Sequence, residues 1–206
     1  TPGRHVEEVA GDDLVHKEVE QAQRQGGQRL AGAGRQPGDG GGAEEVGAAQ
    51  ANGIEPIEFT VARDAIAVVV HPSNPVDQLT LAQVGHLYTG RITNWRERGG
   101  EDRPIVLLSR ESNSGTYVYF LENVVRAGID DDEALFSPDT LLMPSSEGIS
   151  SEIRQNPNTI GYDGLGYVTP DQKVIALAQE AAGPYVEPSV QTVNDGSYPV
   201  ARPLYM

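Results

Sequence analysis

Residues 65–70 read Ala-Ile-Ala-Val-Val-Val, six apolar side chains in succession. A strand with one face in water would alternate apolar and polar residues, so an unbroken run is typical of a strand covered on both faces. The segment His71-Pro72-Ser73-Asn74-Pro75 follows, and its prolines and short polar residues favour a loop. We therefore expect a buried strand inside an α/β sheet.

Helix and strand patterns alternate on the carboxyl side of this run. Three helices are expected, at 80–89, 114–127 and 146–155. Three strands are expected, at 104–108, 159–168 and 173–178. Gly128 is expected to end the second helix, and the single tryptophan, Trp95, is expected to lie in the core. Alternation of this kind, with no internal repeat, indicates an α/β layer architecture.

The amino-terminal quarter of the chain has a different composition. Residues 1–50 contain no Phe, Tyr, Trp or Ile, and glycines are frequent between 26 and 42. Such a segment can bury little apolar surface, so only a mostly solvated helix at 6–25 is expected there. A short helix at 43–50, closed by Asn52-Gly53, marks the beginning of the regular pattern.

The composition excludes several classes of partner and site. The formal net charge is -15 and the pI is near 4.5, whereas nucleic acids and anionic membrane surfaces attract basic faces. No run approaches the ~18 to 20 apolar residues of a membrane span, and the amino end lacks the pattern of a signal peptide. The chain has no cysteine, and the acidic cluster 130–133 lacks the spacing of cation ligands. We therefore expect no metal and no cofactor.

The clearest chemical signal lies between the expected strand 104–108 and the expected helix 114–127. A short polar loop there would let the Arg110 guanidinium and the free N–H groups of Ser114, Gly115 and Thr116 converge. Helix N-termini attract anions through those N–H groups and through the helix dipole. The glycine lets a ligand approach the backbone, and the two hydroxyls add donors. These four residues are predicted to bind an anion.

Other interpretations of the same residues stay open at this stage. Ser114 can simply cap the helix while Arg110 pairs with Glu111. A phosphatase-like enzyme can use the same cradle for a phosphate ester, although no base or metal cluster is visible beside it. A serine hydrolase is disfavoured, because no glycine stands two residues before Ser114 and the four histidines follow no triad-like pattern.

A series of short motifs extends the argument over residues 43–206. In chain order they are Asp64–Val70 with Pro72-Ser-Asn-Pro75, Tyr88-Thr-Gly90, Ile92-Thr-Asn-Trp95, Ser109-Arg-Glu111 with Ser114-Gly-Thr116, Ile160-Gly-Tyr162, Gly164-Leu-Gly-Tyr167 and Arg202-Pro-Leu-Tyr205. Each motif is weak alone, but their ordered series closely resembles the phosphate-binding (PstS-type) proteins of bacterial phosphate ABC transporters.

The resemblance implies a type II periplasmic-binding-protein fold, in which two lobes joined by a hinge close on inorganic phosphate. It implies Arg110, Ser114, Gly115 and Thr116 as the phosphate contacts of the second lobe. The partner loops of the first lobe are not recognisable, so residues 1–62 are interpreted as a poorly matching, incomplete first lobe. Residues 63–206 would be mainly second lobe with hinge strands, truncated at the carboxyl end. We hypothesise that residues 1–42 are a divergent or frame-disrupted version of the first lobe.

The resemblance also implies the biological setting. The chain would be no enzyme, would act as a monomer, and would deliver phosphate to the membrane permease of an ABC transporter. It would be extracytoplasmic, in the periplasm or on the cell surface as a lipoprotein, without inserting into the membrane itself. The choice of phosphate over sulfate as the ligand rests on the resemblance alone. In this family the carboxylate that accepts the phosphate proton belongs to the first lobe.

Overall fold

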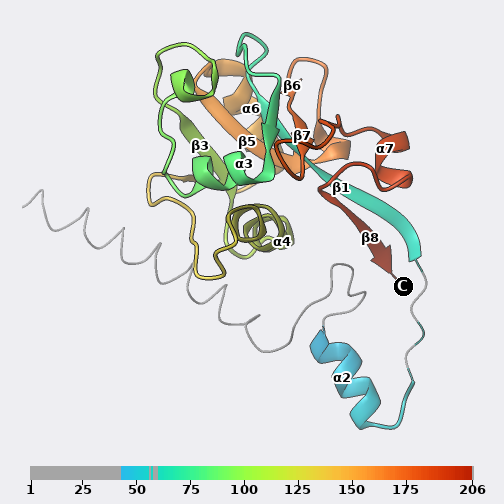
Figure 1. Ribbon diagram of the computed structural model, residues 1–206. Helices are drawn as coiled ribbons and strands as arrows, with labels where there is room; N and C mark the ends of the chain where they lie inside the picture. Colours follow the sequence, from blue (N-terminus) through green and yellow to red (C-terminus); the bar gives the residue numbers. More distant parts are fainter. Residues whose placement is uncertain (1–42, 56, 58–59, 206) are drawn as a thin grey trace, which may run out of the picture.

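The structure is a computed structural model in which residues 43–55, 57 and 60–205 are described (Figure 1). The expected helix at 6–25 and the hypothesis on residues 1–42 lie outside the described residues. The strands are β1 (Thr60–Val70), β2 (Gln78–Thr80), β3 (Val106–Arg110), β4 (Leu141–Met143), β5 (Thr159–Gly164), β6 (Lys173–Val174), β7 (Ala176–Ala178) and β8 (Ala201–Tyr205).

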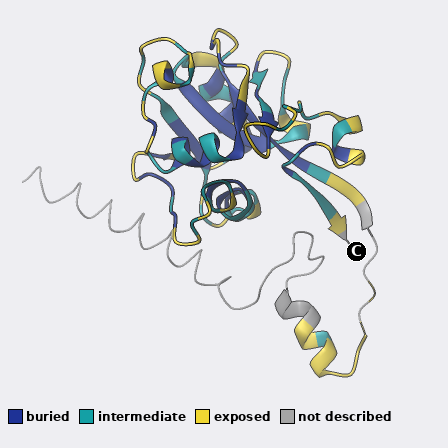
Figure 2. Cartoon of the chain, in the orientation of Figure 1, coloured by how far each residue is buried: buried dark blue, intermediate teal, exposed yellow. Residues whose placement is uncertain are grey.

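The helices are α2 (Ala43–Ala51), α3 (Leu81–Tyr88), α4 (Gly115–Phe120), α5 (Ala127–Ile129), α6 (Ser146–Gln155) and α7 (Val190–Asn194). Two single 3₁₀ turns, η1 (Trp95–Arg98) and η3 (Leu165–Tyr167), and one π-helical segment, η2 (Leu121–Arg126), complete the regular structure. The short helix expected at 43–50 is confirmed by α2, whose described side chains are mostly exposed (Figure 2).

Within the described residues, six strands form one mixed sheet around β1. The order is β4-β3-β5-β1-β6, and β8 pairs with the first half of β1. Strands β4, β3 and β5 run parallel to one another, while β1 is antiparallel to β5, β6 and β8. A separate parallel pair joins β2 to β7. The predicted α/β architecture is confirmed.

Both faces of β1 are buried, as its unbroken apolar run predicts. Every residue from Ala65 to Val70 is at most 2% exposed. Ile66, Val68 and Val70 face the larger core, which α3 and α4 cover, and Ala67 and Val69 face the smaller core beneath α6 (Figures 1 and 2). Because successive side chains of a strand point to opposite faces, one continuous apolar run serves both cores.

Aromatic rings fill the larger core. Tyr162 of β5 stacks on Phe120 of α4 with ring centroids 3.6 Å apart, and Tyr88 of α3 meets both rings edge-on. Trp95 is 2% exposed, and its Nε1 donates a hydrogen bond to the carbonyl oxygen of Asn158 at 2.9 Å. The prediction that the only tryptophan packs in the core is therefore confirmed.

Several predicted boundaries are wrong by a few residues. The strand expected at 104–108 is β3, Val106–Arg110, so Arg110 is the last strand residue and not part of a loop. The strand expected at 159–168 stops at Gly164, and the one expected at 173–178 divides between β6 and β7. In the two later segments apolar composition extends beyond the hydrogen-bonded ladder, whereas β3 keeps the expected length and is shifted by two residues.

The helical segment that starts at Gly115 does not end at Gly128, which corrects the prediction. It continues through η2 and α5 to Ile129, and Asp130 closes it in the left-handed conformation with φ 53°. Gly128 instead allows two helices to pack closely. A Cβ placed on it would lie 2.5 Å from the carbonyl oxygen of Leu81, at the start of α3. The absent side chain is what lets α5 approach α3 so closely.

Replacing Gly128 with alanine is expected to lower the free energy of unfolding by about 1–3 kcal/mol, because the added methyl meets rigid backbone rather than a flexible side chain. Urea unfolding followed by circular dichroism measures this change. Gly166→Ala is the matched control, since a Cβ at Gly166 would meet nothing within 4 Å. Equal stability of the two variants would contradict the close approach of α5 to α3.

Candidate anion-binding site

Three parallel strands bring the predicted site residues to one edge of the sheet. β4, β3 and β5 end at Met143, Arg110 and Gly164, and Arg110 lies directly opposite Met143 in the β3–β4 register. Helix α4 starts after β3 and helix α6 starts after β4, so both helix N-termini lie at this edge. Ligands of open α/β sheets bind in the crevice outside the carboxyl ends of the strands.

The start of α4 has an open approach. Ser114 is the N-cap, and its side-chain oxygen accepts a hydrogen bond from the backbone N–H of Thr116 at 3.3 Å. Gly115 is exposed, and a Cβ placed on it would meet nothing within 4 Å. Ser114 therefore caps the helix, as one interpretation of the sequence expects. The space in front of Gly115 remains accessible to a ligand.

Arg110 points from the end of β3 toward the start of α6. Its Nη1 donates a hydrogen bond to Ser146 Oγ at 3.1 Å, and its Nη2 donates one to the carbonyl oxygen of Pro144 at 3.4 Å. In the described part of the chain Arg110 has no ion pair with Glu111, and no hydrogen bond joins its guanidinium to Ser114 or Thr116. Arg110 and the start of α4 therefore lie at the two ends of the loop 111–114, at one edge of the sheet, without direct contact.

Two residues at this edge were not predicted from the sequence. Ser146 Oγ donates a hydrogen bond to Asp163 Oδ1 at 2.8 Å, and the backbone N–H of Gly164 donates to the same oxygen at 2.8 Å. Asp163 is 3% exposed and is the last residue but one of the buried strand β5. Its carboxylate in the sequence Ile160-Gly-Tyr-Asp163 was the available signal, because an acid inside a buried strand needs a polar partner.

Burial dominates the electrostatics of Asp163. Desolvation raises the pKa of its carboxyl, and the hydrogen bonds from Ser146 and Gly164 and the nearby Arg110 charge partly oppose that rise. Glu147, one residue into α6, is exposed, and hydrogen bonds from its own backbone and from Ser145 lower its pKa. The edge therefore combines a buried acid, an exposed acid and one guanidinium.

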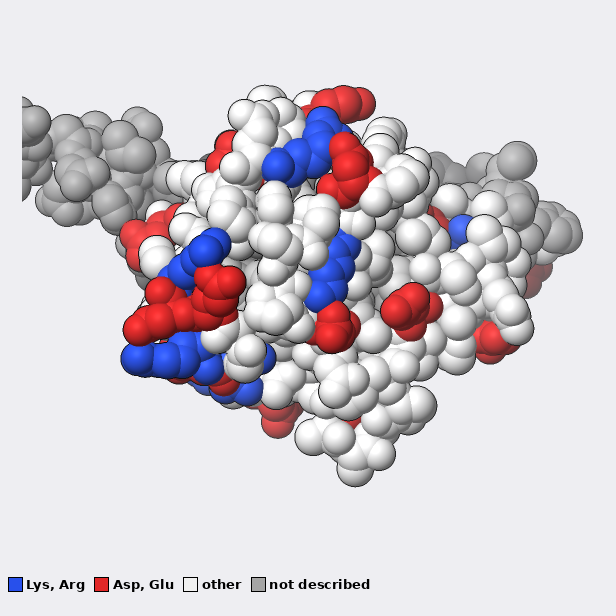
Figure 3. Space-filling model, turned by 90° about the horizontal axis from the view of Figure 1, so that it is seen from above, with Lys and Arg blue, Asp and Glu red and all other residues white. Residues whose placement is uncertain are grey.

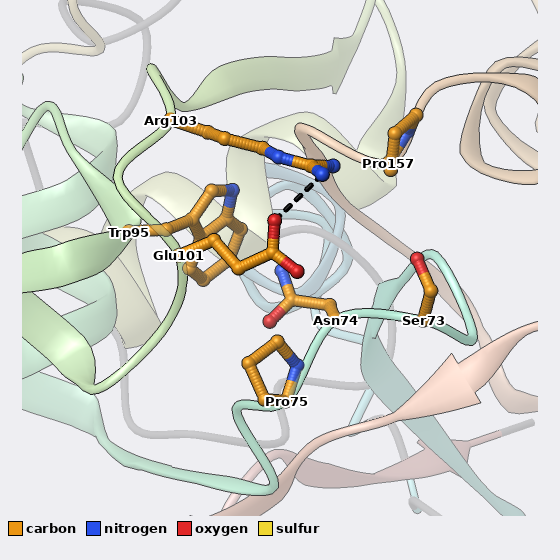
Figure 4. Close-up of a pocket in the computed structure, with 7 residues that line it drawn as sticks. All are labelled: Ser73, Asn74, Pro75, Trp95, Glu101, Arg103 and Pro157. Carbon is orange, nitrogen blue, oxygen red and sulfur yellow. Dashed lines mark ion pairs between the residues drawn. The ribbon is translucent and has the colours of Figure 1, made fainter.

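A separate pocket lies at the opposite edge of the same sheet (Figure 4). It is lined by residues 73–75, which follow β1, by Glu101 and Arg103 before β3, and by Pro157 before β5. The Arg103 guanidinium is paired with the Glu101 carboxylate at 2.6 Å. Because its cation is already paired, this pocket is a poor anion site compared with the edge that holds Arg110.

Two features are absent from the described part of the chain. No helix there has the length and apolar content that a bilayer crossing requires. No group of three or more His, Asp or Glu residues there could hold a metal ion. On the face seen in Figure 3, Lys and Arg lie interspersed with Asp and Glu and form no continuous basic patch.

Residues 41–206 match the family model of the PBP superfamily domain. The phosphate-binding protein PstS of Pseudomonas aeruginosa is 34% identical over 169 residues, which cover 76% of this chain and 50% of that protein. The chain spans about half the length of the curated relatives it matches. These relatives are named for binding phosphate and not for a catalysed reaction.

Two solved structures are similar to the chain over 93% of its length. A phosphate ABC transporter type substrate-binding protein from Clostridium perfringens, with bound phosphate, is 30% identical with a TM-score of 0.62, over 81% of that chain. An ABC-type phosphate transport receptor from Vibrio cholerae is 22% identical, with a TM-score of 0.64 over 82% of its chain, and supports the fold alone. The chain therefore belongs to the PBP superfamily, among its phosphate-binding proteins of the PstS type.

Proposed function

We propose that this chain is a non-catalytic solute-binding protein that captures inorganic phosphate for a phosphate ABC transporter, with Arg110, Ser114, Gly115 and Thr116 as ligand residues. The observation that carries the proposal is the open helix start beside Arg110 at the carboxyl edge of the sheet, in a chain of this family. Both features supply hydrogen-bond donors, and an anion needs donors.

The capping role of Ser114 is compatible with phosphate binding. A hydroxyl can accept the N–H of Thr116 and still donate its own proton to a ligand oxygen. Arg110 uses its Nη1 and Nη2 atoms within the protein, and its Nε is buried without a partner among the described residues. Four or five charge-assisted hydrogen bonds, at about 1.5–3 kcal/mol each, suffice for micromolar binding after ordering costs.

The proposal also assigns residues to the two lobes and gives the protein a cellular location. Residues 1–62 would be a poorly matching remnant of the first lobe, and residues 63–206 would be mainly the second lobe with the hinge strands. The first half of the long strand β1 extends beyond β5 and pairs with β8, and Arg202 of β8 forms an ion pair with Asp64 of β1 at 3.0 Å (Figure 1). These paired strands suit a hinge. The protein would be extracytoplasmic and monomeric and would dock on the membrane permease of the transporter.

Calorimetric titration of the chain with phosphate and with sulfate tests the proposal. We expect saturable phosphate binding with a dissociation constant in the micromolar range or tighter, and weaker sulfate binding. A generic phosphomonoester assayed in parallel should show no turnover. Turnover that Ser114→Ala abolishes would replace the proposal with a phosphatase-like function, and absence of phosphate binding would reject it.

A further inference from the structure

We propose that Asp163 is a positioning residue for Arg110, acting through the hydroxyl of Ser146, and that it thereby sets the affinity of the anion site. The inference rests on the proposed function, because Arg110 is the anion-binding group that it positions. It adds to the site two residues that do not themselves contact the ligand.

The hydrogen bonds have a direction. A serine hydroxyl has one proton, and Ser146 gives that proton to Asp163 Oδ1 at 2.8 Å. Its lone pairs are then available to accept from Arg110 Nη1 at 3.1 Å. The second nitrogen, Nη2, is held by the Pro144 carbonyl at 3.4 Å. Arg110 is therefore fixed at two of its nitrogens, and the first of these contacts depends on an acceptor at position 163.

The strand register explains why Asp163 can do this. Leu107 of β3 lies opposite Ile160 of β5, and continuing that parallel register by three residues brings Arg110 opposite Asp163. Opposed residues of neighbouring strands project to the same face of a sheet. Ser146, at the start of α6 and 6% exposed, closes over that face.

For the fold, a buried acid at this position has a cost as well as a benefit. Asp163 lies opposite Ala67 of β1, and the surrounding core beneath α6 consists of apolar side chains such as Val69 and Leu108. Its Oδ2 is buried without a partner among the described residues. Burying a polar oxygen without a hydrogen bond destabilises a protein, and this cost offsets part of what the two hydrogen bonds to Oδ1 contribute. A loss of phosphate affinity without a loss of stability would therefore identify a functional role.

Three variants test the proposal by phosphate titration. Asp163→Val and Ser146→Ala should each weaken phosphate binding about 5- to 20-fold, because each removes one link to Arg110. Asp163→Asn should keep the affinity within about threefold, since its amide oxygen still accepts from Ser146. The double variant Asp163→Val/Ser146→Ala should be no weaker than the single ones. Ser150→Ala, one turn along α6 and also buried, is the matched control and should bind as the unaltered chain does.

Stability and side-chain mobility complete the test. Urea unfolding should find Asp163→Val and Asp163→Asn cooperatively folded, so that a difference in phosphate affinity between them does not come from unfolding. Nitrogen-15 NMR of the Arg110 side chain, without phosphate, should find it ordered in the unaltered chain and in Asp163→Asn, and mobile in Asp163→Val. An ordered Arg110 in Asp163→Val would overturn the proposal. So would tighter phosphate binding by both Asp163 variants, which would mean that the carboxylate repels the ligand. Because the NMR measurement needs no ligand, it decides the positioning role even if the chain binds no phosphate.

Discussion

Replacing Arg110 with alanine is expected to weaken phosphate binding about 100-fold. The change removes two or more charge-assisted hydrogen bonds to the anion, each contributing about 1.5–3 kcal/mol, and tenfold in affinity corresponds to about 1.4 kcal/mol. The fold should tolerate the change, because Arg110 is half-buried and, within the described residues, its guanidinium donates hydrogen bonds to Ser146 and Pro144 only. Calorimetric titration with phosphate measures the effect, and circular dichroism checks the fold.

Two further arginine variants make the comparison specific. Arg110→Lys keeps the positive charge but loses the planar fork, so an intermediate loss of about tenfold is expected. Arg96→Ala is the matched control, because Arg96 lies in η1 and its exposed guanidinium pairs with Asp102 at 3.0 Å. Phosphate affinity should not change in that variant. If Arg110→Ala bound phosphate as the unaltered chain does, Arg110 would have no place in the site.

The order of elements could be predicted because apolar patterns report burial directly. The run at 65–70 predicted a doubly covered strand, and burial of every one of its residues confirms that expectation. Pattern alone could not predict where hydrogen bonding stops, so Arg110 was expected in a loop although it ends β3. Gly128 was misjudged for a different reason, since only the approach of α3 distinguishes a packing glycine from a helix terminator.

Of the residues at the candidate site, the sequence brought together only those that are close along the chain. Arg110 ends β3 and the Ser114 cap follows four residues later, so strand and helix signals sufficed to place them together. Ser146 and Asp163 come to the same edge through the parallel pairing of β3 with β4 and β5. Strand β4 has only three residues and gave no usable signal, so the start of α6 could not be placed beside Arg110 from the sequence.

Replacing Tyr162 with alanine should have the largest effect on stability, lowering the free energy of unfolding by about 3–5 kcal/mol. Its side chain is fully buried, and its ring stacks on Phe120 and meets Tyr88 edge-on. Its hydroxyl shares a hydrogen bond of 2.6 Å with Ser109 Oγ. Burial raises the pKa of Tyr162, so the hydroxyl keeps its proton at neutral pH. Urea unfolding measures the loss.

Tyr162→Phe separates the ring from the hydroxyl. It keeps the stacking and removes one hydrogen bond, so a loss of about 1–2 kcal/mol is expected. Phosphate titration of both variants then tests how the core supports the site. Phe120 belongs to α4, so the cavity left by Tyr162→Ala lies beneath the helix whose start faces the ligand. Tyr162→Ala should therefore also weaken phosphate binding, whereas Tyr162→Phe should not. Equal stability of the two variants would mean that the stacked ring does not hold α4 on the sheet.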